Sequence, residues 1–161
     1  MTIAIRPARP ADVAALAQLS RQLNRHQGDP ETYFTGHAIA RDLFGRNAVA
    51  EAFLATSGRE PVGYAVFIDA YETAYAAHGL FMCDLFVVEE ARGRGVGKAL
   101  VTAVARTAKE RGLTFVWWTS KTWNTGAHAF YRRLGAEDQT VVAHALHGDA
   151  FDRLAGEDEP G

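Results

Sequence analysis

The chain has 161 residues, 48% of them hydrophobic, which matches one compact domain with a sizeable core and leaves little room for two. Its formal net charge is −2 and its basic residues form no long run, so the composition argues against a nucleic-acid or membrane surface. The single cysteine, Cys83, can form no internal disulfide. Because the first part of the chain also lacks the apolar core of a signal peptide, we expect a cytoplasmic protein. We expect one domain over 1–155 and an acidic tail over 156–161.

The first third of the chain predicts one strand and two helices. Residues 3–6 alternate like a short strand, and Pro10 can open a helix with an apolar face that ends near Gly28. A second helix is expected from Thr32 or Tyr33 to Phe44, before Gly45.

The middle of the chain reads as strands with a polar loop. Residues 50–56 and 62–68 predict an antiparallel hairpin, and 80–88 predicts the next strand. The intervening 69–79 is rich in polar and aromatic residues, so we expect a loop that shapes a substrate pocket through Tyr71, Glu72 and Tyr75. The alternative is that these tyrosines cover an exposed edge of the core.

From Val96 onward the sequence predicts two helices and two strands. An amphipathic helix is expected from Val96 until Gly112 stops it, because its apolar residues recur at intervals of three and four. After it we expect a strand at 114–119, a helix at 126–134 and a last strand at 140–146.

A glycine-rich turn joins the strand at 80–88 to that helix. The glycines at alternate positions leave backbone N–H groups free to converge on an anion at the helix N-terminus, and nearby Arg and Lys residues add positive charge. The spacing is G-x-G-x-G, not the G-x-G-x-x-G of dinucleotide sites, and Ala99 replaces the hydroxyl that a Walker A loop requires. The pattern that fits is [Q/R]-x-x-G-x-[G/A], read at Arg92, Gly95 and Gly97.

This turn resembles the acyl-CoA pyrophosphate loop of the GNAT N-acetyltransferase superfamily. Trp123-Asn124, followed by Phe130-Tyr131 and then Gly135-Ala136, resembles the second acyl-CoA motif of that superfamily. The resemblance implies an α/β (α+β) fold, the GNAT acyl-CoA N-acyltransferase fold, with a central mixed, mostly antiparallel sheet flanked by helices. Shorter matches, among them Asp84-Leu85-Phe86-Val87, are similar to the diamine (spermidine/spermine) N-acetyltransferase branch. That branch usually has a glutamate where this chain has Cys83.

The activity that the resemblance implies is transfer of an acetyl group from acetyl-CoA to a primary amine of a small molecule, by direct attack in a ternary complex. The amine would be a short diamine, a polyamine or a basic amino acid. The alternatives are a protein N-terminal or lysine acetyltransferase and a non-catalytic acyl-CoA-binding sensor. The residues implied in acetyl-CoA binding are Leu85, Phe86, Val87, Arg92, Gly93, Arg94, Gly95, Val96, Gly97, Lys98, Asn124, Ala127 and Tyr131.

Two side chains are candidates for catalysis. A protonated amine has no lone pair, so a group must take its proton; Asp84 is the first candidate, directly or through water, with Glu72 and His78 in reserve. Asp84 is also expected to bind substrate, and it could instead only hold its strand or the amine in place. Tyr131 is implied as the donor to the departing thiolate of coenzyme A, unless it is a core aromatic.

The sequence also supports expectations about Cys83, about metal binding and about the oligomeric state. Cys83 fits packing better than a covalent acyl-enzyme role. No metal is expected, because the histidines and the cysteine lack ligand spacing. A homodimer is expected, since the diamine branch is typically dimeric and 140–154 is more apolar than a free tail should be.

Overall fold

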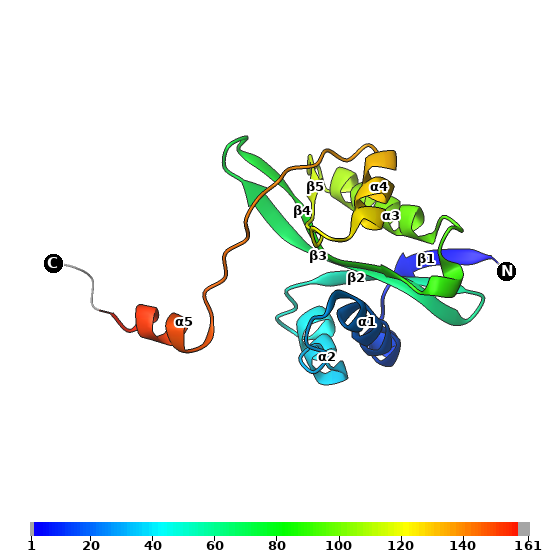
Figure 1. Ribbon diagram of the computed structural model, residues 1–161. Helices are drawn as coiled ribbons and strands as arrows, with labels where there is room; N and C mark the ends of the chain where they lie inside the picture. The colour runs from blue at the N-terminus through cyan, green and yellow to red at the C-terminus, as the bar shows by residue number, and fades with distance from the viewer. Residues whose placement is uncertain (1, 158–161) are drawn as a thin grey trace. The chain divides into compact units, whose positions relative to one another are not determined.

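The computed structural model describes residues 2–157, and the chain forms two compact units, Met1–Asn124 and Thr125–Gly161. The first unit contains a five-stranded sheet in the order β1-β2-β3-β4-β5 (Figure 1). Neighbouring strands are antiparallel except for β4 and β5, which are parallel, so the predicted mixed, mostly antiparallel sheet is confirmed. The strands are β1 (Ile3–Pro7), β2 (Glu51–Ser57), β3 (Glu60–Glu72), β4 (Ala77–Val87) and β5 (Val116–Trp117).

Helices cover both faces of this sheet. Helices α1 (Val13–Gln27) and α2 (Gly36–Phe44) pack on one face, where Leu16, Ile39 and Tyr64 belong to one buried cluster. Helix α3 (Val96–Glu110) packs on the other face, where its apolar side chains bury Leu80 and Met82 (Figure 1). Short 3₁₀ turns at Pro10–Asp12 and Glu89–Ala91 precede α1 and α3. The sheet therefore carries two separate cores, one on each face.

The second helix begins later than the sequence predicted. Its N-cap is Thr35, whose side chain accepts a hydrogen bond from the backbone N–H of Ala38 at 3.2 Å, so α2 begins at Gly36 and not at Thr32 or Tyr33. A threonine that caps a helix satisfies one of its unpaired N–H groups, which fixes the start.

The loop predicted over 69–79 is wrong. Both strands continue through it, with Tyr71 paired to His78 and Glu72 to Ala77, so only Thr73–Ala76 forms the turn. The carboxylate of Glu72 accepts from the N–H of Ala74 at 3.0 Å and supports that turn. Polar and aromatic residues suit a strand with one solvated face, which explains why this polar segment still forms a hairpin.

The last strand of the first unit is short. Val116–Trp117 is the part of the predicted segment 114–119 that forms a strand, and the backbone N–H of Thr114 also donates to the carbonyl of His78 on β4 at 3.0 Å.

The second unit begins with α4 (Thr125–Arg133), as the sequence predicted within one residue at each end. The strand predicted at 140–146 is wrong: this segment is irregular, and Val142 is 78% exposed. A strand needs a neighbouring strand to pair its backbone, and none lies beside this segment in the described residues of its unit. A helix not expected from the sequence, α5 (Gly148–Ala155), follows. Most of the predicted tail at 156–161 lies outside the described residues.

In the part of the chain that the structure describes, no helix has the length and apolar character needed to cross a membrane.

Candidate active site

A β-bulge in β4 turns Asp84 toward the α1 face of the sheet. Asp84 pairs with Val66 on β3, whereas the next β3 residue, Phe67, pairs with Met82, so Cys83 is an extra residue in β4. Side chains of a regular strand alternate between faces, but after an extra residue the alternation shifts by one. Cys83 and Asp84 therefore both face the helices α1 and α2, and both line the same cavity.

That cavity has a volume of about 350 Å³ and lies wholly within the first unit. Its walls come from the β3–β4 ladder, from α1 and from the region around the end of α2, and they combine apolar surface with several polar side chains. The lining residues are Ser20, Asn24, Phe34, Asp42, Leu43, Val49, Ala50, Val66, Cys83 and Asp84. Small-molecule sites typically have this character, with apolar walls and a few converging polar groups.

Asp84 is the titratable group best placed for proton transfer. Burial raises the pKa of its carboxyl above the usual value, and the nearby charge of Asp29 acts in the same direction. A hydrogen bond from the hydroxyl of Tyr64 to Oδ2 of Asp84, 2.8 Å long, acts in the opposite direction on that pKa. A partly desolvated carboxylate at a cavity wall can pair with a cation and accept a proton from it.

Cys83 is poorly suited to nucleophilic attack. Burial, with the adjacent charge of Asp84 as a second cause, raises the pKa of its thiol to about 11. Because the thiolate is the reactive form, little of it is present near neutral pH. This pKa argues against a covalent acyl role. The packing role expected for Cys83 is nevertheless wrong, because the residue is exposed on the cavity wall.

The glycine turn presents an uncapped helix N-terminus. Gly93 and Gly95 have φ of 72° and 80°, in the left-handed region that favours glycine, and no atom lies within 4 Å of a Cβ built on either. Gly95 is the N-cap of α3 and has no side chain to bond the first N–H groups of the helix. Such N–H groups can bind a phosphate. The residues present therefore fit the pyrophosphate of an acyl-CoA.

Arg92 holds the turn against the end of β4. Its Nε donates to the carbonyl of Val87 at 3.0 Å, and its guanidinium lies 5.9 Å from the centre of the Phe86 ring. Part of its hydrogen-bonding capacity therefore serves the turn itself.

The edge of β4 beside the turn is open. Within residues 2–157, the pairing of β4 with β5 ends at Phe81 and Trp117. Leu85, Phe86 and Val87 lie beyond that point, so their backbone on this side has no β5 neighbour. An extended molecule that carries amides can add to such an edge as a strand does. This edge fits the pantetheine arm that the sequence resemblance implies.

Helix α4 carries the remaining candidates in the second unit. Ala127 and Tyr131 are four residues apart on α4 and so lie on one helical face. Burial raises the pKa of the Tyr131 phenol, which keeps its proton in place at neutral pH. Asn124 is the last residue of the first unit, and its backbone N–H donates to the carbonyl of Lys121 at 3.0 Å.

The structure does not bring Tyr71, Glu72 and Tyr75 to this cavity. None of them lines it, and the paired end of the hairpin at Ala77 is seven residues from Asp84 along β4. At about 3.3 Å per residue, that separation is roughly 20 Å. Tyr75 is 81% exposed at the hairpin turn, so these residues form no cover over Asp84.

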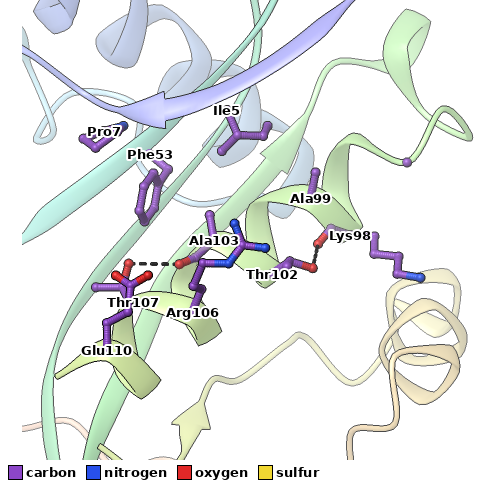
Figure 2. A pocket seen from close by; sticks show the side chains of 11 residues that line it. Ile5, Pro7, Phe53, Lys98, Ala99, Thr102, Ala103, Arg106, Thr107 and Glu110 are labelled. Atoms are coloured by element: carbon purple, nitrogen blue, oxygen red, sulfur yellow. Dashed lines mark hydrogen bonds between the residues drawn. The ribbon is translucent and has the colours of Figure 1, made fainter. Parts of the chain in front are cut away.

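A larger groove of about 620 Å³ lies elsewhere, between α3 and the strands β1 and β2 (Figure 2). It begins at Gly95 and Lys98 and runs along α3 past Arg106, over an apolar floor that includes Phe53. Asp84 does not line it. The smaller cavity is therefore the one that contains the candidate base.

Comparison with known proteins agrees with this geometry. Residues 14–136 match the acetyltransferase (GNAT) family. The chain is 26% identical over 167 residues to the thialysine N-epsilon-acetyltransferase of Bos taurus, covering 96% of this chain and 98% of that protein. A shorter match, 37% identical over 75 residues, covers 47% of this chain and 33% of an L-ornithine N5-acetyltransferase of Arabidopsis thaliana.

Among solved structures, an integron cassette protein from the mobile metagenome of V. cholerae has the same fold, with a TM-score of 0.81, 22% identity and coverage of 98% of this chain and 99% of that one. The family match spans both compact units and includes the glycine turn and Tyr131. The chain therefore belongs to the acetyltransferase (GNAT) family, is similar to its thialysine and L-ornithine N-acetyltransferases, and is an acyl-CoA-dependent N-acetyltransferase.

Proposed function

We propose that the protein transfers the acetyl group of acetyl-CoA to a primary amine of a compact dibasic molecule, such as a short diamine or a basic amino acid. The observation that carries this proposal is Asp84, a carboxylate that lines a cavity of about 350 Å³ on the strand whose edge leads to the glycine turn. This volume is near the lower end for small-molecule sites, which favours a compact substrate. The names of the relatives, which refer to thialysine and L-ornithine, support the same class.

Asp84 acts on the amine in two ways. Its negative charge pairs with the substrate ammonium, which loses water as it enters the cavity and needs a partner of opposite charge. Asp84 then takes one proton from the ammonium, which frees the nitrogen lone pair for attack, and the second proton that the nitrogen loses on forming the amide leaves with the thiolate as the thiol. The pKa of an alkylammonium is about 10.4, far above that of a carboxyl group, so transfer before attack is uphill. We therefore expect the rate to rise from about pH 7 to 9, as more of the amine is already deprotonated.

The acyl donor is held by backbone and not by a deep pocket. The N–H groups around Gly93 and Gly95 and the side chains of Arg94 and Lys98 bind its pyrophosphate, and the edge of β4 at Leu85–Val87 binds its pantetheine arm. Bound acetyl-CoA supplies an acetyl thioester whose leaving group is a thiolate. Tyr131, protonated because burial raises its pKa, donates a hydrogen bond where that negative charge develops.

The amine itself is tested with the purified enzyme and a panel of acceptors. Acetyl transfer from acetyl-CoA is followed by mass spectrometry for a short diamine, ornithine, lysine, thialysine, spermine and a peptide with a free N-terminus. We expect the highest kcat/KM with a compact dibasic amine. If spermine is the best substrate, the inference of a compact substrate is wrong, although the acetyltransferase assignment stands. If the peptide is the best substrate, the natural acceptor is a protein.

We further propose that residues 1–155 work as one acetyltransferase domain in the cytoplasm, as a homodimer. Apolar side chains of the C-terminal segment support a dimer, since Val141, Phe151 and Leu154 are all more than half exposed in the single chain. Light scattering should give twice the 17.5 kDa of one chain. A particle of 17.5 kDa at micromolar concentration would contradict the dimer.

A further inference from the structure

Tyr64 is buried against helix α1 and hydrogen-bonds to Asp84. Tyr64 is on β3 and fully buried, and its hydroxyl donates to Oδ2 of Asp84 at 2.8 Å. Ser20 of α1 is 1% exposed, lines the same cavity as Asp84 and is near enough to Tyr64 to influence the pKa of its phenol. Burial and the charge of Asp84 raise the pKa of Tyr64, while the nearby hydroxyl of Ser20 acts in the opposite direction.

We propose that Tyr64, supported by Ser20, is a positioning residue that holds the carboxylate of Asp84 in its reactive orientation. The bond from Tyr64 fixes Oδ2 and leaves Oδ1 to receive the substrate ammonium. This proposal rests on the proposed function of Asp84 as the group that receives the amine.

The bulge in β4 explains why Asp84 needs this partner. In a regular strand, with Cys83 paired in register and no bulge, the side chain of Asp84 would share the face of Met82 and point to the α3 side, among apolar residues. The bulge instead sets Asp84 opposite Val66 and diagonal to Tyr64, which pairs with Phe86 two positions further along β4. Diagonal neighbours on one face of a sheet lie within reach of an aromatic side chain. Two separate features, the bulge and the buried hydroxyl, thus act on the same carboxylate.

Other groups near Asp84 set the direction of the expected pH effect. Asp29, whose carboxylate pairs with Lys121 at 3.0 Å, acts to raise the pKa of Asp84, and burial does so more strongly. Asp42, which also lines the cavity, is neutralised in part by Arg41 at 2.7 Å. The remaining lining groups that could donate a hydrogen bond or titrate are Ser20, Asn24 and Cys83.

Tyr64 supplies the hydrogen bond that opposes these effects. Its loss should therefore raise the pKa of Asp84, so that protonation abolishes activity at a higher pH than in the wild type.

The test compares Tyr64→Phe and Ser20→Ala with two matched controls. Tyr33→Phe removes a hydroxyl from a tyrosine that is 78% exposed, and Ser57→Ala removes one from a serine of β2 that is 5% exposed and outside the cavity. For each folded variant, kcat/KM for the best amine is measured against pH, and acetyl-CoA affinity is measured by calorimetry.

Tyr64→Phe should move the acid limb of kcat/KM upward by about 0.5 pH unit or more and raise KM for the amine roughly 10-fold, with acetyl-CoA affinity unchanged. Ser20→Ala should act in the same direction with a smaller shift, and the two controls should match the wild type. The positioning role is overturned if folded Tyr64→Phe keeps the wild-type limb and KM. If Tyr64→Phe does not fold, Ser20→Ala becomes the deciding variant. The proposal is overturned if the acid limb of kcat/KM lies at the same pH in Ser20→Ala as in Ser57→Ala.

Asp84→Asn separates this proposal from the function on which it rests. We expect it to lower kcat/KM by about 10² to 10⁴-fold and to remove the acid limb that protonation of Asp84 causes, while the rise from about pH 7 to 9 that the amine causes remains. If Asp84→Asn keeps the wild-type rate and limb, Asp84 does not receive the amine and both proposals fail. If Asp84→Asn loses the limb while Tyr64→Phe and Ser20→Ala retain it unshifted, only the positioning role fails.

Discussion

Replacing Tyr131 with phenylalanine is expected to lower kcat by roughly 10 to 10³-fold and to leave acetyl-CoA affinity nearly unchanged. Burial raises the pKa of this phenol, so the wild-type group keeps its proton and can donate to a developing negative charge. The phenol's reference pKa of about 10 exceeds the roughly 8.5 of a thiol, so complete proton transfer would be uphill by about 2 kcal/mol. A hydrogen bond made only as the charge develops affects kcat and not binding.

The measurement is steady-state kinetics of the variant beside calorimetric titration with acetyl-CoA. Tyr33→Phe is a suitable control, because it removes the same hydroxyl from a largely exposed tyrosine. Phenylalanine retains the ring, including its packing 5.4 Å from the Phe130 ring, so the helix should be preserved. Wild-type turnover in Tyr131→Phe would make Tyr131 a structural aromatic of α4.

The parts of the fold that the sequence predicted well are those set by local chemistry. Helix α3 follows from apolar residues such as Leu100 and Val104 at four-residue spacing and from Gly112, which has φ of 75° after the helix. Helix α1 ends in the same way, before Gly28 with φ of 74°. In both cases the stop signal and the periodic face lie in one short stretch of chain.

The errors arise where distant pairing decides the structure. Residues 69–79 have a loop-like composition, but the register of β3 on β4 extends the hairpin to Glu72 and Ala77. The opposite error occurred at 140–146, where apolar residues favour a strand but no strand pairs with them in the described residues of that unit. Local propensity is weaker than the presence or absence of a partner strand.

The candidate site also combines residues that local motifs predict with residues that only the folded chain brings together. Asp84 and the glycine turn could be nominated from short motifs, whereas Ser20, Asn24 and Tyr64 reach the site from other elements. No local signal marks the bulge in β4. Residues 80–88 are apolar at every position except Asp84, so the sequence shows no alternation that a bulge would interrupt.

The phosphate-binding role of the turn is tested most sharply by two glycines at opposite ends of α3. Gly95 and Gly112 have φ of 80° and 75°, and a Cβ on either would meet no atom within 4 Å. A β-branched residue is strained equally at both, by about 1 to 3 kcal/mol. Only Gly95 stands where the N–H groups of the helix N-terminus are exposed to an anion.

Gly95→Val is therefore expected to weaken acetyl-CoA affinity at least tenfold, because its side chain occupies the approach to those N–H groups and opposes the left-handed φ that aligns them. Gly112→Val should lower the melting temperature to a similar extent and leave affinity unchanged. Calorimetry on both folded variants distinguishes the two effects. Equal affinities in Gly95→Val and the wild type would remove the pyrophosphate from this turn, and equal losses in both variants would assign the effect to general strain of α3.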